Sequence, residues 1–381
     1  AGLTHVGGSG TRSNQRNQDA CFSSECGGRA LILGVLDGHG PDNGRLAAAA
    51  GAAALCAHLE ENVARLEVDP QGAMHAAFGS AHAAIRSALF EKATALHGSP
   101  PVEVSPGGYL LGTDAQPLDG GATASVVAVV RGHILVVANV GDSDALLGGR
   151  LADGSIGYEQ LCADHTPMCA DEFERVRRLA DARPTDWAPA NFAFDFEAED
   201  DDAPLVDVFR QPKGGRAVVD KASEARLDAQ GLLGYKTARG DRPTALIMPQ
   251  TDTYDQQKLG VTRSLGDFYF QWGGVTWEPS VTCIDLHDVA SQLTGMTLLI
   301  ASDGLWDLWL YNEAISQVLN PPAGIASWTE LMPHLGKLIE STRKQGEELF
   351  GDSADNITAI VASFQLTSAA DARGQAPTSV M

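Results

Sequence analysis

Two β-branched runs separated by three residues are the feature that most constrains the fold of this chain. Residues 122–130 and 134–139 are rich in valine and isoleucine, and only Arg131, Gly132 and His133 lie between them. So short a connection, with a glycine inside it, predicts a β-hairpin and therefore an antiparallel pairing of the two strands. A doubly wound parallel sheet is disfavoured, because its strands would be joined by long crossovers.

Other segments alternate between strand and helix patterns. Short apolar runs predict buried strands at residues 30–36, 297–301 and 357–364. Longer stretches with helical spacing predict helices at residues 45–66, 70–96, 305–319 and 328–349. Hairpin-connected strands together with paired long helices indicate an α+β layered fold.

One interval differs in character from the rest. Residues 181–257 contain several prolines and the acidic run 195–202 (DFEAEDDD). This composition favours a solvated surface insertion over a specific binding site. The small and polar residues at 367–381 predict a flexible tail. We therefore expect a single domain over residues 1–366 that carries an extended insertion.

Charge and composition exclude several classes of function. The chain has a net charge of −22, which repels nucleic acid and anionic membrane, so we expect neither as a partner. With 44% hydrophobic residues it can bury a core, and no apolar run approaches the roughly 20 residues that span a bilayer. We expect a monomer.

The cysteines indicate a reducing compartment. Six of them are scattered through 381 residues without a dense framework, which is typical of an intracellular protein, cytoplasmic or nuclear. Cys162, His165 and Cys169 lie close in sequence, but zinc is disfavoured there because no second pair of ligands follows.

Four aspartates lie next to predicted strand ends: Asp37, Asp142, Asp303 and Asp355. Each alone is explained by the preference of aspartate for turns. If the strand ends converge, however, the carboxylates share one volume, and two like charges 4 Å apart repel by about 4 kcal/mol at an effective dielectric of 20. Such a cluster needs cations, and oxygen ligands select magnesium, manganese or calcium.

Eight short motifs strengthen this hypothesis, because together they resemble those of the type 2C metal-dependent protein serine/threonine phosphatases, the PPM family. They run in the family's order from Asn17 to Val361, nearly the whole chain. In sequence they are NQDA at 17–20, VLDGHG at 35–40, GATA at 121–124, ANVGDS at 138–143, DHTP at 164–167, LGVTRSLGD at 259–267, ASDGLWD at 301–307 and DNIT at 355–358.

The resemblance implies a fold and an activity. The fold is a four-layer α/β/β/α sandwich, with two antiparallel sheets flanked by paired helices. The activity is hydrolysis of phosphoserine and phosphothreonine in phosphoprotein substrates. In this family a water that bridges two divalent cations, Mn²⁺ or Mg²⁺, attacks phosphorus, and no phosphoenzyme forms. The interval 181–257 then enlarges a flap near the site.

The resemblance also implies a set of metal ligands. Asp37 would bridge both metals and the Gly38 carbonyl would bind the second, while Asp303 and Asp355 complete the first. Asp19 would hold water beside the metals.

Two further roles follow from the resemblance. Asp142 and Asp307, together with Asp303, would form a weaker third metal site. His39 would act as the general acid that protonates the leaving oxygen.

Three positions depart from the family pattern. Gln18 replaces a glutamate that many members carry, although some plant and protist members share this form. Asp144 stands where arginine is common. The arginine that binds phosphate is usually found where this chain has Asn14, so either Arg12 or Arg16 is the candidate.

Two other functions remain open at this level. A catalytically silent relative could act as a binding scaffold, but Asp37, Asp303 and Asp355 are all present. An enzyme for small phosphoesters or nucleotides is disfavoured because the chain has no glycine-rich GxxxxGK loop.

Overall fold

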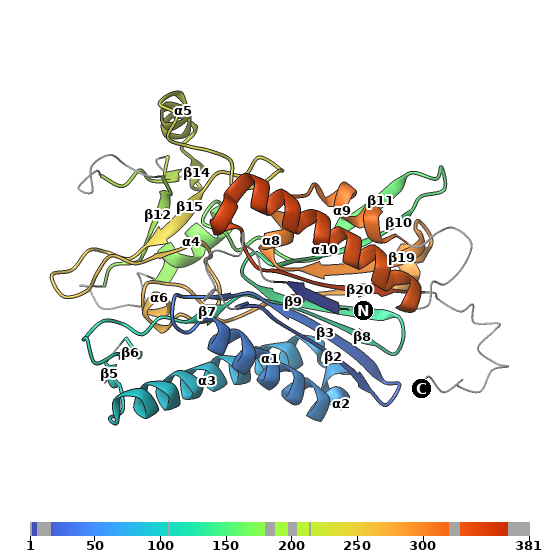
Figure 1. The fold of residues 1–381 in the computed structure, drawn as a ribbon, viewed down its shortest axis with the longest axis horizontal. Helices are drawn as coiled ribbons and strands as arrows, with labels where there is room; N and C mark the ends of the chain where they lie inside the picture. The colour runs from blue at the N-terminus through green and yellow to red at the C-terminus, as the bar shows by residue number, and fades with distance from the viewer. Residues whose placement is uncertain are drawn as a thin grey trace.

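Two antiparallel sheets pack face to face in the structure, and helices cover both outer faces (Figure 1). The computed structural model describes residues 2–5, 17–105, 107–179, 187–196, 204–212, 215–319 and 328–364. The α+β class and the four-layer α/β/β/α sandwich expected from the sequence are confirmed.

The first sheet contains the predicted hairpin at its centre. Its strand order is β18–β9–β8–β3–β2. The bounds are β2 (Ala20–Cys26), β3 (Ala30–Leu36), β8 (Ala124–Val130), β9 (Ile134–Val140) and β18 (Ser280–Asp285). Side chains of β8 alternate between the faces, so that Val126 packs towards the helices and Val127 towards the other sheet. Burial on both faces explains why these strands are apolar throughout.

The second sheet carries the strands that end near the C-terminal motifs. Its order is β1–β20–β19–β10–β11. The bounds are β1 (Gly2–His5), β10 (Asp144–Arg150), β11 (Ile156–Gln160), β19 (Thr294–Ala301) and β20 (Ile357–Ser363). In β19, Leu298 faces the first sheet and Leu299 faces the outer helices. The core between the sheets is therefore built from alternate residues of both.

Helices cover the two outer faces. The first sheet is covered by α1 (Gly44–Glu61), α2 (Val63–Leu66) and α3 (Pro70–His97), and the second by α8 (Asp303–Trp306), α9 (Tyr311–Val318) and α10 (Trp328–Phe350) (Figure 1). Two predicted helices are each divided. The first is interrupted at Asn62, and the second between Asp307 and Leu310, where Leu310 has extended backbone angles. None of the described helices is long and apolar enough to cross a membrane.

A small sheet of strand order β17–β7–β4 lies at one end of the sandwich. It joins three of the sequence motifs: β4 (Gly38–His39), β7 (Gly121–Ala122) and β17 (Leu265–Gly266). The short helix α6 (Phe268–Trp272) follows directly, and α7 (Leu286–Ala290) follows β18. A separate hairpin pairs β5 (Val102–Val104) with β6 (Tyr109–Leu111).

The interval 181–257 contains secondary structure in its described part. After α4 (Ala170–Leu179) come β12 (Asn191–Phe194), β13 (Phe209–Arg210), β14 (Val218–Val219), α5 (Lys221–Ala229) and β15 (Thr244–Ile247), and β15 pairs with both β12 and β16 (Lys258–Leu259). Phe192 and Phe209 are buried, so this part adds to the core in addition to exposing surface. Residues 197–202 of the acidic run and the tail at 367–381 lie outside the described residues.

Candidate functional site

The structure brings four predicted aspartates into one pocket. Asp37 directly follows β3, Asp142 lies two residues after β9, Asp303 begins α8 after β19, and Asp355 precedes β20. All four line a cavity of about 560 Å³. We call this group, together with Asp19 and Asp307, the acidic centre. The convergence that the sequence could only assume is therefore present.

Backbone pairing explains why these strand ends meet. The Thr123 N–H donates to the Asp37 carbonyl at 2.9 Å, and the hydroxyls of Thr123 and Ser143 lie 2.6 Å apart, which ties β3, β8 and β9 together next to the pocket. In the second sheet the Ser302 N–H donates to the Thr358 carbonyl at 3.0 Å. These bonds fix the strand ends that carry the carboxylates.

Asp19 and Gln18 link the two sheets across the pocket. The Ser302 hydroxyl donates to Asp19 Oδ2 at 3.0 Å. The Gln18 N–H donates to Asn356 Oδ1 at 2.7 Å, and its side-chain Nε2 donates to the Gly40 carbonyl at 2.8 Å. A glutamate could not make the last bond, because a carboxylate only accepts. The amide at Gln18 thus has a structural role of its own here.

Two glycines permit close approach of the backbone around the pocket. A Cβ atom at Gly38 would overlap the backbone around Gly44 and Gln18, and one at Gly304 would overlap the Asn356 carbonyl. Any other residue at Gly304 would push α8 away from the segment that carries Asp355. The Asp-Gly pairs in the sequence therefore serve to bring the carboxylates together.

Crowding raises the pKa of several members of the acidic centre. Burial, and then the charges of Asp303, Asp19 and Asp355, hold the pKa of Asp37 well above its usual value. Burial raises the pKa of Asp19 to about 6, and burial with the charge of Asp303 raises that of Asp355 to about 7.

Asp307 shows the same effect despite a nearby cation. Burial raises its pKa to about 8, although Lys236 opposes the shift. The acidic centre without metal thus holds more negative charge than its surroundings stabilise.

Two buried carboxylate oxygens have no hydrogen-bond partner among the described residues: Asp19 Oδ1 and Asp303 Oδ1. Such atoms are costly to bury unless something else satisfies them. Carboxylate and carbonyl oxygens are the donors that Mg²⁺ and Mn²⁺ prefer. The donor set therefore fits hard divalent cations.

Lys236 is a member of the site that the sequence did not reveal. Its ammonium Nζ lies 3.0 Å from Asp142 Oδ2 and 3.5 Å from Asp303 Oδ2. Burial lowers the pKa of Lys236, but the carboxylates of Asp142, Asp303 and Asp307 outweigh it and keep the lysine charged. A lone lysine in the insertion carries no motif, so only the fold could place it here.

His39 is held by a second residue to which no role was assigned from the sequence. His39 Nε2 lies 2.6 Å from Asp267 Oδ2, and the Ser264 hydroxyl donates to the same oxygen at 2.5 Å. Burial lowers the pKa of His39, but the carboxylate of Asp267 outweighs it and the net shift is upward. Asp267 is the last residue of the motif LGVTRSLGD, and its place in that motif is the sequence signal that could have identified it as a site residue.

The remaining candidates are placed as follows. Arg12 and Arg16 lie outside the described residues. Asp144 is buried and accepts bonds from Tyr311 Oη and Gln160 Nε2, each at 2.7 Å. Its carboxylate is therefore held by hydrogen bonds from these two side chains.

The cysteine and histidine residues considered for zinc have other partners. Cys162 Sγ lies 3.5 Å from Ser125 Oγ, and His165 Nε2 lies 2.9 Å from Ser280 Oγ. Both residues are buried and follow β11, and their partners Ser125 and Ser280 belong to β8 and β18 of the first sheet.

Comparison with solved structures defines the class of fold. The chain resembles the crystal structure of serine-threonine phosphatase 2C from Toxoplasma gondii with a TM-score of 0.56 and 16% identity, covering 96% of this chain and 94% of that one. It also resembles a bacterial serine phosphatase with a TM-score of 0.50 and 16% identity, covering 97% and 98%. At this identity the likeness establishes the fold alone.

Comparison of sequences identifies the family. The family model for protein phosphatase 2C matches residues 32–181 and 247–345, more than half of the chain, and the chain belongs to this family. The unmatched interval between these ranges coincides with most of the insertion at 181–257.

Two curated relatives come from Arabidopsis thaliana. Probable protein phosphatase 2C 72 is 47% identical over 200 residues, which cover 51% of this chain and 41% of that protein. Probable protein phosphatase 2C 61 is 26% identical over 204 residues, covering 54% and 44%. The matches thus span less than half the length of these relatives.

Proposed function

We propose that this chain is a metal-dependent protein serine/threonine phosphatase. One observation carries the proposal: a crowded acidic centre with unsatisfied carboxylate oxygens, in a chain of the protein phosphatase 2C family. Asp37 with the Gly38 carbonyl, Asp303 and Asp355 are the proposed ligands of two divalent cations, Mn²⁺ or Mg²⁺. When bound, this pair activates a water for attack on phosphorus and stabilises charge on the phosphoryl group.

The residues of the chain complete the proposed reaction. Asp19, fixed by the Ser302 hydroxyl at 3.0 Å, orients water beside the ligands. His39 lines the same pocket, and the carboxylate of Asp267 at 2.6 Å favours the protonated imidazole and raises the pKa of His39 above its ordinary value. His39 then donates its proton to the departing serine or threonine oxygen. No side chain forms a bond to phosphorus, so no phosphoenzyme is expected.

The proposed domain organisation follows the sequence. Residues 1–366 form one catalytic domain, the insertion at 181–257 extends the flap that borders the pocket, and 367–381 form a tail. Lys236 of the insertion lines the pocket, and so do Lys258 and Gly260, which directly follow the insertion. We propose phosphoproteins as substrates, a monomeric state, and a cytoplasmic or nuclear location. Arg12 or Arg16 is the proposed phosphate ligand.

The test is release of phosphate from a phosphothreonine peptide with Mn²⁺, with Mg²⁺ and with a chelator. We expect turnover with either metal, none with the chelator, and no effect of an inhibitor of the okadaic acid class. Turnover that survives complete removal of metal would contradict the proposal, and so would binding of phosphopeptide without any turnover.

A further inference from the structure

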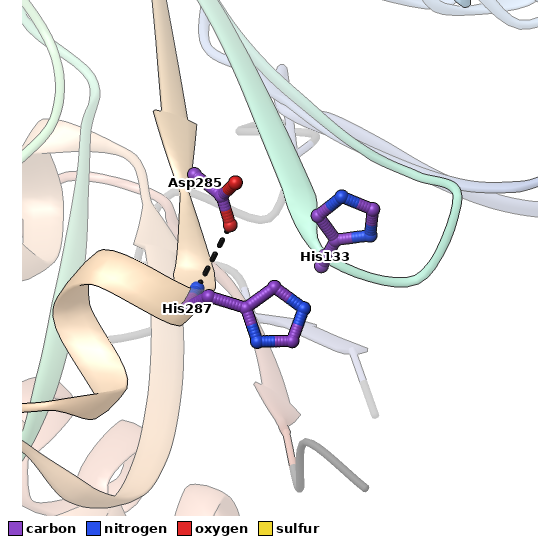
Figure 2. Close-up of side chains that lie close together, drawn as sticks. All are labelled: His133, Asp285 and His287. Carbon is purple, nitrogen blue, oxygen red and sulfur yellow. Dashed lines mark hydrogen bonds between the residues drawn. The ribbon is translucent and has the colours of Figure 1, made fainter. Parts of the chain in front are cut away.

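A second group of metal-type ligands lies away from the acidic centre. One imidazole nitrogen each from His133 and His287 and one carboxylate oxygen from Asp285 all lie within 4.8 Å of one another. Figure 2 shows the three side chains close to one another beside the end of β18. None of the three lines the acidic pocket.

This group, which we call the histidine corner, sits at the opposite end of the first sheet. His133 lies in the turn of the β8–β9 hairpin, whereas Asp142 lies beyond the far end of β9. The seven residues of β9 span about 20 Å at roughly 3.3 Å per residue. An ion at the histidine corner is therefore separate from any ion in the acidic centre.

Paired backbone holds the histidine corner in place. Arg131 and Gly132 have φ angles of 53° and 75°, as a tight hairpin turn requires, and they set the position of His133. The Leu286 N–H donates to the His133 carbonyl at 2.8 Å, which joins the hairpin turn to the start of α7. In the β9–β18 ladder, Asp285 pairs with Ile134. All three ligands thus come from elements fixed to one another.

Hydrogen bonds also orient the ligand atoms. His133 Nδ1 lies 2.9 Å from the Arg131 carbonyl. Because a carbonyl only accepts, Nδ1 carries the hydrogen and Nε2 keeps its lone pair for a ligand. A carbonyl partner of this kind is typical of histidines that bind metals. Asp285 Oδ1 accepts the His287 N–H at 2.9 Å, which fixes the carboxylate (Figure 2).

We propose that His133, Asp285 and His287 bind one divalent transition-metal ion of the zinc class, with a fourth position open to solvent. Two imidazoles and one carboxylate are a set that Zn²⁺ accepts and that Mg²⁺ binds poorly. The acidic centre offers only oxygen. The two ends of the first sheet would then select different metals.

The experiment measures Zn²⁺ and Co²⁺ binding to the full chain in excess Mg²⁺, which occupies oxygen sites without competing for imidazole. Calorimetry gives the stoichiometry, and the visible absorption of Co²⁺ reports nitrogen ligands. We expect one equivalent, with affinity at least about tenfold weaker in His133→Gln and in His287→Gln. His97→Gln, an exposed histidine at the end of α3, is the matched control and should bind as the wild type does.

Mg²⁺-dependent turnover should be the same in all these variants, because none touches the acidic pocket. Retained turnover also shows that each variant is folded. Wild-type affinity in both His133→Gln and His287→Gln would overturn the proposal. Equal weakening in His97→Gln would overturn it as well, since binding would then be nonspecific.

An independent observation concerns Lys236, and it rests on the proposed function. The segment around Lys236 is anchored to the end of α8 and the start of α9, which cover the outer face of the second sheet. The Ala238 N–H donates to the Asp307 carbonyl at 2.7 Å, Arg239 donates to the Trp306 carbonyl, and its guanidinium lies 4.7 Å from the centroid of the Tyr311 ring. These contacts hold the ammonium group against Asp142 and Asp303.

The position matters because Asp142, Asp303 and Asp307 are the residues expected to hold a third cation. Lys236 borders both the main pocket and a neighbouring cavity of about 290 Å³ that Asp307 lines. We infer that Lys236 supplies the positive charge at this place, so that the protein binds two divalent cations in the acidic centre and excludes a third.

The number of Mn²⁺ ions bound, measured by calorimetry and by electron paramagnetic resonance, tests this inference. Lys236→Met should bind one more ion than the wild type, and the conservative Lys236→Arg should bind the wild-type number. Any ion at the histidine corner is common to all three proteins and cancels in the difference.

The outcomes separate this inference from the proposed function. Equal, nonzero stoichiometry in wild type and Lys236→Met would overturn the inference alone. Absence of binding in both would overturn the proposed two-cation function and the inference with it.

Discussion

Two buried acidic sites in this protein differ in how far neighbouring groups balance their negative charge. Glu172 in α4 is 3% exposed and contacts Arg263 Nη2 at 2.6 Å and Arg175 at 2.9 Å. Burial alone would raise its pKa, but the two guanidinium groups outweigh it and lower the pKa to about 2. In the acidic centre the pKa of Asp37, Asp19, Asp355 and Asp307 is raised.

The difference shows how a structural carboxylate can be told from a functional one. Glu172 has its charge balanced within the chain by two arginines, of which Arg175 also donates to the Thr262 and Gly274 carbonyls and Arg263 to the Glu278 carbonyl. Among the described residues, Lys236 is the cation that contacts the carboxylates of the acidic centre, where it pairs with Asp142 and Asp303, and Arg239 acts on Asp307 more weakly. The acidic centre therefore stores repulsion that an external cation would relieve, and this is what a metal centre requires.

The largest effect is expected from Asp303→Asn. This change should lower metal-dependent turnover of a phosphothreonine peptide by about 100-fold or more, because it removes a proposed ligand. The metal-free protein should be at least as stable as the wild type in urea, since a repelling charge is removed. Asp288→Asn, in the short helix α7, is the control and should change neither quantity. Full activity of Asp303→Asn would exclude the metal role.

His39→Ala should produce the next largest effect on activity, and a selective one. Turnover of phosphopeptides should fall by about 10²-fold or more, because the alkoxide leaving group needs a proton. An activated aryl phosphate needs little protonation and should be hydrolysed at nearly the wild-type rate. Similar losses on both substrates would show that His39 positions the substrate or the metals and is not the acid.

Glu172→Gln tests the other half of the comparison. It leaves the half-buried Arg263 and Arg175 without their buried counter-charge and should lower the free energy of unfolding by about 3 kcal/mol. Glu340→Gln is the matched control. Glu340 also pairs with an arginine, Arg343 at 2.9 Å, but on the surface, so its loss should leave stability nearly unchanged. Equal effects of the two changes, measured by urea denaturation, would contradict the distinction.

The pH dependence of stability should be the smallest effect, and its sign is informative. Groups with a raised pKa, Asp19, Asp355 and Asp307, bind protons more tightly in the folded state. Their stabilising contribution is present at low pH and is lost as pH rises through about 6 to 8. Glu172, with its lowered pKa, contributes no slope there, because it is ionised in both states above about pH 5.

Metal-free protein should therefore be less stable at pH 8 than at pH 5.5, by about 1–3 kcal/mol. Excess Mn²⁺ should abolish or reverse this difference, because bound cations favour the ionised carboxylates. The measurement is urea denaturation with a chelator and with metal. Stability of the metal-free protein that rises with pH over this range would refute the account of the acidic centre.

Much of the fold was predictable from local sequence patterns. The valine-rich hairpin and the apolar run at 30–36 formed strands as expected, since burial on both faces demands uninterrupted apolar residues. The helix boundaries were less predictable. Helix 305–319 is divided because Ala238 and Arg239 of the insertion bond the Asp307 and Trp306 carbonyls at the end of α8, and no local pattern shows this.

The sequence by itself determined the strands, the long helices and the identity of the aspartates beside them, because hydrophobic periodicity and motif order are local properties. Only the tertiary structure decided that Lys236 enters the acidic centre, that Asp267 holds His39, and that His133 meets Asp285 and His287. These contacts join residues far apart in the chain. Their energies depend on burial and on neighbouring charges, which exist only once the layers have packed.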